Sequence, residues 1–153
     1  MKLIVLNGAK HTKKTTLALR LASNSDVQYV RPCTSKKDVD CNFIEKEQLD
    51  KMKDECEVLS CTTIKGIDYV FFKHQFNADY NIIIADDYAV IDILNNWNDD
   101  ILLVRCVSEN QGKSERFGSY LYDHEFDIVF NVDTDNYYDL EAMIEWKKDL
   151  TSV

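Results

Sequence analysis

The sequence predicts an α/β domain in which a parallel sheet is covered by helices on both faces. Two observations carry this prediction. Short apolar runs such as Ile82 to Ala85 and Ile101 to Val104 are typical of strands buried on both faces of a parallel sheet. Stretches with helical patterning separate these runs along the chain, which is the order found in α/β folds. The 153 residues are 45% hydrophobic and 29% charged, so we expect one domain, residues 1–153, with a substantial core.

The first half of the chain predicts two strands, two helices and a hairpin. Residues 2–7 form an apolar run rich in branched side chains, and residues 15–23 predict a helix that packs on this strand through its leucines. Residues 27–30 predict a second strand, which ends at Arg31-Pro32 because proline forces its neighbour into extended geometry. A polar helix over residues 45–53, with Leu49 and Met52 facing inward, precedes a hairpin of residues 57–63 and 67–73 around Lys65-Gly66.

The second half returns to alternating strands and helices. We expect strands at residues 81–85, 101–107 and 127–132, a helix at 90–97, and an amphipathic helix at 138–150 with Leu140, Met143, Ile144 and Trp146 on its apolar face. Residues 31–73 interrupt this rhythm and are the candidate inserted subdomain. The polar stretch at about 109–122 has flanking glycines and is the candidate for a short lid.

The overall charge excludes several classes of function. The chain has 18 Lys and Arg against 27 Asp and Glu, a net charge of −9, which disfavours general nucleic-acid or anionic-membrane binding. No apolar run approaches the length of a membrane span. The five cysteines are odd in number and contain no CxxC, so we expect reduced thiols rather than disulfides or a zinc site. We therefore expect a cytoplasmic protein without a signal peptide.

A candidate phosphate-binding loop lies between the first strand and the first helix. Residues 8–15 read Gly-Ala-Lys-His-Thr-Lys-Lys-Thr, which fits the spacing GxxxxGK[ST] except that Lys13 replaces the second glycine. In such a loop, successive backbone N–H groups and the helix N-terminus converge on an anion. Lys14 would reach the terminal phosphates, and Thr15 would place its hydroxyl on Mg²⁺.

Lys13 is the residue that fits this loop least well. A side chain at this position costs about 1 kcal/mol or more if the backbone must adopt a positive φ, whereas an additional cation beside phosphates gains charge-assisted contacts. The alternative is a cationic, well-capped strand-to-helix turn that holds no ligand. Three lysines and three threonines within seven positions of an acidic chain favour the phosphate-binding interpretation.

With this loop, three further segments carry a family resemblance: Arg31-Pro32 leading to Phe43-Ile44-Glu45-Lys46-Glu47, the hairpin with Gly66 and Tyr69, and the ending at residues 126–133. On these residues the chain resembles the nucleoside monophosphate kinases, and its order of elements is most similar to guanylate kinase. The resemblance implies a P-loop kinase core with a small β-rich monophosphate-binding insertion and a lid. It also implies transfer of the ATP γ-phosphoryl group to a nucleoside or deoxynucleoside monophosphate, with Mg²⁺. Short, divergent kinases of this kind are typical of phage genomes.

The loop, the resemblance and the position of Asp86 and Asp87 after a central strand together assign candidate roles. Lys14, Arg31, Arg105 and Arg116 are expected to neutralise the transferring phosphoryl group, with Lys113 beside Arg116. Gly8, Lys10, Thr12, Lys13, Lys14, Thr15, Thr16, Asn131 and Asp133 are expected to bind ATP. Arg31, Lys36, Ser60, Tyr69, Asp86 and Asp87 are expected to bind the acceptor, and Thr15 and Asp86 the Mg²⁺, Asp86 through water.

Structural alternatives stand beside these roles. Arg31 is alternatively a surface arginine, and Arg105 a partner in a structural salt bridge. The carboxylates of Asp86 and Asp87 are alternatively acids at a helix N-terminus. Tyr69 alternatively packs in the hairpin, and Asn131 and Asp133 alternatively form a turn.

The chain also departs from the family pattern. Lys36 and Lys37 stand where the family has a second phosphate-binding arginine, and Cys41 replaces a tyrosine. Ser60 or a neighbouring threonine replaces the carboxylate that reads guanine, which argues against strict GMP specificity. Two rival functions follow: a catalytically inactive guanylate kinase-like module that binds a nucleotide or a protein partner, and a P-loop kinase for another small phosphoacceptor. The sequence does not decide whether the chain forms a homodimer.

Overall fold

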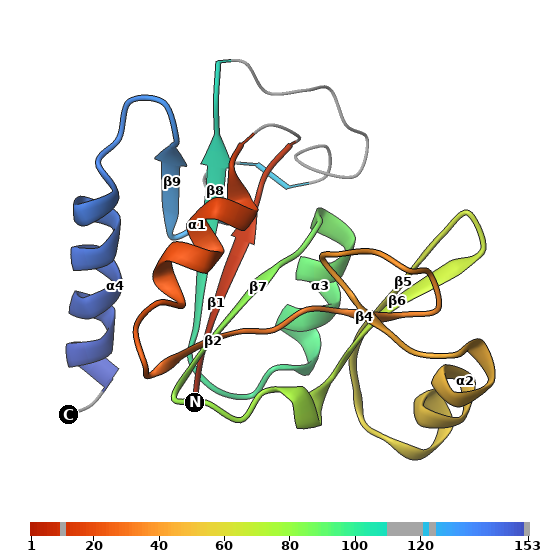
Figure 1. Ribbon diagram of the computed structural model, residues 1–153. Coiled ribbons are helices and arrows are strands. Elements are labelled where there is room, and N and C mark those ends of the chain that lie inside the picture. The colour runs from red at the N-terminus through yellow and green to blue at the C-terminus, as the bar shows by residue number, and fades with distance from the viewer. Residues whose placement is uncertain (10–11, 110–120, 123–124, 152–153) are drawn as a thin grey trace.

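The computed structural model describes residues 1–9, 12–109, 121–122 and 125–151. Its main sheet has five strands in the order β2-β7-β1-β8-β9 (Figure 1). These strands are β1 (Lys2–Asn7), β2 (Val27–Tyr29), β7 (Tyr80–Ile84), β8 (Ile101–Val107) and β9 (Ile128–Asn131). All their pairings are parallel, which confirms the predicted parallel α/β sheet.

The central strand β1 is buried along its whole length because it has a partner on each side. It pairs with β7, where Leu6 lies opposite Ile84, and with β8, where Asn7 lies opposite Arg105. All six of its residues are buried. The carboxyl ends of β1, β7 and β8 therefore meet at one edge of the sheet, where ligands bind in open α/β folds.

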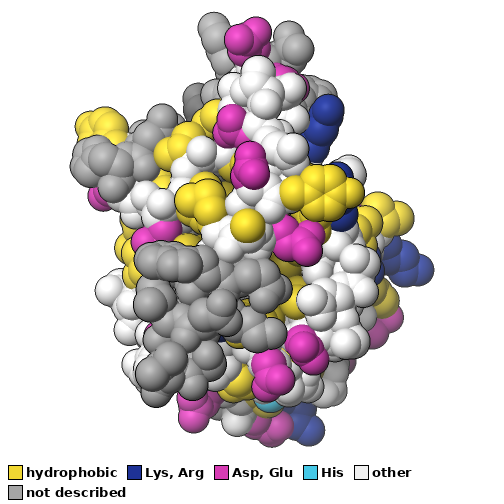
Figure 2. Space-filling model, turned by 90° about the vertical axis from the view of Figure 1, so that its left-hand side faces the viewer, with side chains coloured by type: hydrophobic (Ala, Val, Ile, Leu, Met, Phe, Trp, Pro, Cys, Tyr) yellow, Lys and Arg dark blue, Asp and Glu magenta, His cyan; other side chains and the backbone are white. Residues whose placement is uncertain are grey.

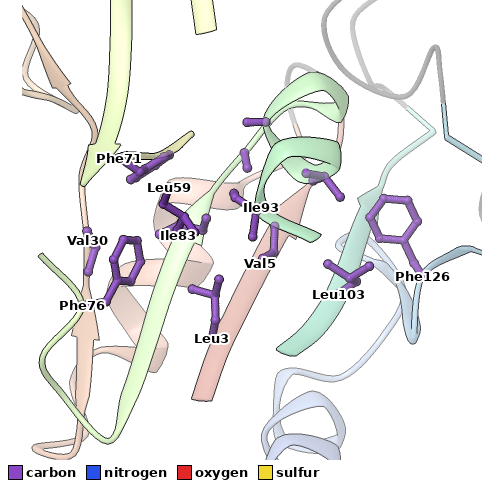
Figure 3. Packing of buried hydrophobic residues seen from close by; sticks show 13 residues of the cluster. Leu3, Val5, Val30, Leu59, Phe71, Phe76, Ile83, Ile93, Leu103 and Phe126 are labelled. Carbon is purple, nitrogen blue, oxygen red and sulfur yellow. The ribbon is translucent and has the colours of Figure 1, made fainter. Parts of the chain in front are cut away.

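Helices cover both faces of this sheet. On one face, Leu3 and Val5 pack with Ile83, Leu103 and Ile93, the last of these from helix α3 (Asp87–Asn96) (Figure 3). On the other face, Ile4 and Leu6 pack with residues of helices α1 (Lys14–Leu21) and α4 (Tyr137–Thr151). The alternation of β1 side chains between the two faces follows from the period of two along a strand.

A second sheet is built from the segment that interrupts the strand–helix rhythm. Its strand order is β4-β3-β6-β5, with β3 (Cys33–Thr34), β4 (Asn42–Phe43), β5 (Val58–Ile64) and β6 (Ile67–Phe72), and helix α2 (Lys46–Glu55) accompanies it. The expected hairpin is β5–β6, which turns at Lys65 (φ 51°) and Gly66 (φ 77°). Two central residues with positive φ match the right-handed twist of the strands that they connect.

The hairpin packs onto the core of the main sheet. Leu59 and Phe71 belong to the same buried cluster as Leu3 and Ile83 (Figure 3). The Asn96 side chain at the end of α3 also donates a hydrogen bond to the Leu59 carbonyl (3.1 Å). The second sheet is therefore held against the carboxyl half of β7 and against α3.

Two apolar side chains that were expected to face inward do not. Leu19 is 51% exposed and Met143 is 47% exposed. In α1 the buried side chains are Leu17, Ala18 and Leu21, and Leu19 lies about 200° around the helix from Leu17, at 3.6 residues per turn. The side chain of Trp146 lies outside the described residues.

The helix α3 begins at Asp87, earlier than expected, because Asp86 caps it. The Asp86 Oδ1 accepts from the Ala89 N–H at 2.9 Å.

The surface reflects the acidic composition. On the side that carries α4, Asp and Glu side chains are spread among hydrophobic and neutral ones, and Lys and Arg are sparse (Figure 2). Within the part of the chain that the structure describes, no helix has the length and apolar character needed to cross a membrane.

Candidate functional site

The candidate phosphate-binding loop starts at the carboxyl end of β1. Gly8 has a φ of 148°, and a Cβ atom placed on it would lie 2.3 Å from the carbonyl oxygen of Cys106 in β8. No side chain fits in that space, and L-residues rarely adopt this backbone conformation. Glycine is therefore required here by the closeness of the loop to the neighbouring strand.

Lys14 and Thr12 hold the loop together through its own backbone. The Lys14 ammonium donates to the carbonyl oxygens of Gly8 (2.8 Å) and Ala9 (2.7 Å) and to the Thr12 hydroxyl (3.2 Å). The buried Thr12 hydroxyl donates in turn to the Ala9 carbonyl at 2.7 Å. Thr16 is exposed on the first turn of α1. The loop lysine thus lies over the loop, with its charge on backbone carbonyls.

Lys13 occupies the left-handed region expected of the glycine that it replaces. It is the N-cap of α1, with φ 54° and ψ 32°, and its side chain makes no capping hydrogen bond. The side chain itself is exposed. A non-glycine residue in this conformation carries about 1–2 kcal/mol of backbone strain. The lysine at position 13 therefore lowers the stability of this loop relative to a glycine.

Beside the loop lies a cavity of about 260 Å³ between α1, the end of β7 and the second sheet. Of the candidate residues, Thr15, Ser60, Tyr69 and Asp86 all line it. They come from α1, β5, β6 and the connection between β7 and α3, so the fold brings together residues that are far apart in sequence. The cavity therefore connects the first helix with the second sheet.

The inner wall of the cavity carries two buried polar side chains. Ser60 is 2% exposed, and its hydroxyl has no hydrogen-bond partner among the described residues. Asp86 is 4% exposed and uses Oδ1 to cap α3. A buried hydroxyl without a partner costs about 1–3 kcal/mol, so Ser60 is the point of this wall that a polar ligand group would satisfy.

The outer part of the cavity is formed by residues that the sequence did not single out. Tyr29, Asp38 and Asp40 line it together with Cys41. Burial, helped by the charges of Asp38 and Asp40, raises the pKa of the Cys41 thiol to about 11, so Cys41 is a neutral thiol at pH 7. A short loop with acidic residues has no hydrophobic periodicity, so the sequence contained no signal that Asp38 and Asp40 line a cavity.

Arg31 lies next to the cavity rather than in its wall. Its guanidinium carbon is 5.2 Å from the ring centroid of Tyr29, and its buried Nε has no hydrogen-bond partner among the described residues. Burial raises the pKa of the Tyr29 phenol, and the charge of Asp40 adds to this shift. Arg31 is therefore half-buried with an unused donor, unlike the free surface arginine that was its alternative.

Asp87 and Arg105 lie on the other side of β7, away from the cavity wall. Arg105 Nη2 is 3.2 Å from Asp87 Oδ1, and both side chains are buried. The guanidinium also stacks on Phe126, 4.2 Å from its ring centroid. This is the structural salt bridge that the sequence left as the alternative for Arg105.

The remaining candidates are distributed over the surface and beyond the described residues. The Asn131 side chain accepts from the Asp133 N–H (3.0 Å) in a turn after β9, and Asp133 Oδ2 accepts from the Ser108 hydroxyl (2.6 Å), which ties this turn to the end of β8. Lys36 is exposed. Lys10, Lys113, Arg116 and most of the candidate lid at 109–122 lie outside the described residues. Among the described residues, no group of three or more His, Cys, Asp or Glu side chains is arranged to hold a metal ion.

The architecture is shared with a solved guanylate kinase. The guanylate kinase from Anaplasma phagocytophilum matches 97% of this chain and 85% of its own length with a TM-score of 0.63, at 11% sequence identity. The chain has a guanylate kinase-like P-loop fold. No protein-family model matches the sequence, and no curated protein matches it. At this identity the match establishes the fold, and the activity rests on the site.

Proposed function

We propose that this protein is a nucleoside or deoxynucleoside monophosphate kinase that uses Mg²⁺ and ATP. One observation carries the proposal. Thr15, next to the loop lysine, lines the same cavity as Ser60 and Tyr69 of the second sheet. A γ-phosphate held at the loop and an acceptor phosphate held by the second sheet would therefore face each other across one cavity, and phosphoryl transfer requires such positioning.

The residues present fit a bound Mg²⁺–ATP. The Gly8 backbone and the N-terminus of α1 supply N–H donors for phosphate oxygens, and the Lys14 ammonium already lies over the loop, where it donates to the Gly8 and Ala9 carbonyls. Thr15 and Asp86 offer a hydroxyl and a carboxylate on one cavity wall, and oxygen ligands are those that Mg²⁺ prefers. The bound metal would neutralise charge on the phosphates.

Arg31 and Tyr69 are the residues that we assign to the acceptor phosphate. The unused Nε of Arg31 gives a donor without breaking an existing contact, and the charge assists the hydrogen bond. Ser60 is assigned to the uncharged end of the acceptor, with Lys36 at the rim. A single hydroxyl replaces the carboxylate that would bind two guanine donors, so we expect the acceptor range to extend beyond GMP.

In this proposal the protein positions the two phosphates and neutralises their charge, and no covalent enzyme intermediate forms. Lys14 and Arg31 hold the two phosphates in line. An acceptor phosphate oxygen forms a bond to the γ-phosphorus, and the bond from that phosphorus to the oxygen of the leaving diphosphate breaks. Arg105 is assigned an indirect role, through its ion pair with Asp87. Arg116, which lies outside the described residues, is assigned to the transferring phosphoryl group.

A catalytically inactive module that binds a nucleotide or a protein is the second candidate. The observation that favours it is the charge of the cavity: Asp38, Asp40 and Asp86 line it, and no Lys or Arg does so among the described lining residues. Three carboxylates repel a phosphate dianion, so this arrangement disfavours turnover unless Arg31 and the metal compensate. A kinase for an uncharged small acceptor would share this cavity.

Calorimetric titration and a turnover assay separate these functions. Mg-ATP and a panel of ribo- and deoxynucleoside monophosphates are titrated into wild type, Lys14→Ala and the control Lys46→Ala, which changes an exposed lysine of α2. We expect Mg-ATP binding that requires Lys14 only, binding of at least one monophosphate, and turnover of that pair. Nucleotide binding without turnover would favour the inactive module. Dissociation constants above the millimolar range, about −4 kcal/mol, for both nucleotides would contradict the kinase proposal.

A further inference from the structure

Beneath the phosphate-binding loop, three buried side chains form a cluster: Asn7, Asp87 and Arg105. Asn7 and Asp87 are 0% exposed and Arg105 is 5% exposed. The Asn7 amide donates to Asp87 Oδ1 (2.9 Å) and accepts from Arg105 Nε (3.2 Å), while Arg105 Nη2 pairs with the same Asp87 oxygen. Each member thus contacts both others, and the two charges are compensated within the cluster.

This cluster joins four segments that are remote in sequence. Asn7 ends β1, Asp87 starts α3 and Arg105 lies in β8. The Asn7 amide also donates to the carbonyl of Ala85 after β7 (2.9 Å). The fourth segment is the backbone at Leu121: its N–H donates to Asp87 Oδ2 (2.9 Å), and its carbonyl accepts from Arg105 Nη1 (2.6 Å). The ion pair therefore holds one residue, Leu121, through both of its backbone polar groups.

The cluster bears directly on the loop because Asn7 precedes Gly8. The Gly8 backbone has no free space toward Cys106, which follows Arg105 in β8, and the Gly8 carbonyl accepts from Lys14. A displacement of Asn7 would move the Gly8 carbonyl and with it the Lys14 ammonium. Packed regions of this kind transmit small shifts rather than absorb them.

We propose that the cluster of Asn7, Asp87 and Arg105 is a positioning unit for the phosphate-binding loop, and that it couples Mg-ATP occupancy of the loop to the backbone at Leu121. The inference rests on the proposed function only in that Mg-ATP binds the loop. It gives Asp87 and Arg105 a role that requires no contact with the acceptor or with the reacting phosphates. Coupling between two sites is reciprocal, so order at Leu121 also favours Mg-ATP binding.

Arginine is specifically suited to this position. Its three nitrogens each reach a different partner: Nε reaches Asn7, Nη1 reaches Leu121 and Nη2 reaches Asp87. A lysine ammonium is a point charge without this fixed fork. Arg105→Lys therefore keeps the charge opposite Asp87 but loses the simultaneous hold on Asn7 and Leu121.

The test compares two buried asparagines on neighbouring strands. Asn7→Ser removes the amide at the loop end of the sheet. Asn81→Ser, the control, removes an equally buried amide at the opposite end of β7, where its side chain exchanges hydrogen bonds with the Ala78 backbone. Three quantities are measured: unfolding free energy in urea, the Mg-ATP dissociation constant, and the exchange rate of the Leu121 amide by NMR with and without Mg-ATP.

We expect both variants to lose stability, and only Asn7→Ser to weaken Mg-ATP binding, by about tenfold. Mg-ATP should slow exchange at Leu121 in wild type and in Asn81→Ser but not in Asn7→Ser. If Asn7→Ser does not fold, Arg105→Lys takes its place with the same expectation. Equal Mg-ATP affinity in Asn7→Ser and Asn81→Ser, or unchanged exchange at Leu121 in wild type, would overturn the inference while the proposed function stands. A wild type that fails to bind Mg-ATP would overturn both.

Discussion

Ser60 and Ser108 are both buried serines, but only the hydroxyl of Ser108 has a hydrogen-bond partner, Asp133 Oδ2 at 2.6 Å, while that of Ser60 has none among the described residues. One hydroxyl therefore contributes to the fold, and the other lies unused on a cavity wall. Because of this difference, replacing each serine by alanine distinguishes a serine that stabilises the fold from one that is available to a ligand.

Ser60→Ala is expected to leave the free protein as stable as wild type or more stable, and to weaken binding of the acceptor. The reason is that alanine removes a buried, unsatisfied group worth about 1–3 kcal/mol. Ser108→Ala, the matched control, should lose about 1 kcal/mol because it removes the Ser108 hydroxyl from Asp133 Oδ2, which keeps the Glu109 N–H at 3.2 Å. Urea unfolding and acceptor titration measure both. A clear loss of stability in Ser60→Ala, with acceptor affinity intact, would show that Ser60 is structural.

Gly8→Ala is expected to destabilise the protein by more than 2 kcal/mol and to abolish Mg-ATP binding. The added Cβ would meet the Cys106 carbonyl at 2.3 Å, and backbone in a strand cannot move aside cheaply. Gly66→Ala is the control, since it also has a positive φ but open space around it, and it should cost about 1 kcal/mol. Similar losses in the two variants would mean that backbone conformation alone matters at Gly8.

Lys13→Gly is expected to raise the free energy of unfolding by up to about 1 kcal/mol, because glycine relieves the left-handed strain at φ 54°. Turnover should hold or rise in a kinase that tolerates this loop. Lys65→Gly, at the other positive-φ lysine, should give the same gain without affecting nucleotide binding. If neither Lys13→Gly nor wild type turns over any acceptor, the inactive module becomes the better proposal.

The Cys41 thiol is expected to react slowly with iodoacetamide until the pH approaches 11. Burial raises its pKa from the usual 9.0 to about 11. The folded state keeps its proton over an interval in which the unfolded chain loses it, so folding stability should fall as the pH rises from about 9 to about 11. Mass spectrometry of alkylated peptides gives the rate at each pH. A half-maximal rate near pH 9 would contradict the buried environment, and Cys41→Ser should reduce the alkaline loss of stability.

The main sheet was predictable because its strands have strong local patterns. Residues 3–6 form a short run of branched apolar side chains, and the helices that follow have an apolar face. The strands Cys33–Thr34 and Asn42–Phe43 were not predictable, since two residues define no period. They exist because β6 offers a partner to β3, and β3 offers one to β4.

The candidate site was only partly predictable for a related reason. Motif spacing identified Lys14 and Thr15, since the loop is a local feature. Asn7 carries no motif, and its partners Asp87 and Arg105 are 80 and 98 positions away. The expected functional roles of Asp87 and Arg105 came from their places after or within strands. Whether Asp87 and Arg105 face the cavity or the buried side chain of Asn7 depends on packing that a single sequence does not encode locally.

Both neighbours of the central strand β1 lie far downstream of it in sequence. Leu3 to Leu6 belong to β1, and the partners of that strand begin at Tyr80 in β7 and Ile101 in β8. At about 5–20 residues per second, synthesis needs on the order of 5–20 s to extend the chain from β1 to the end of β8. During synthesis, β1 has neither neighbour until β7 has been made, and only one until β8 has been made. The sheet that buries this strand is therefore completed only after most of these residues have been synthesised.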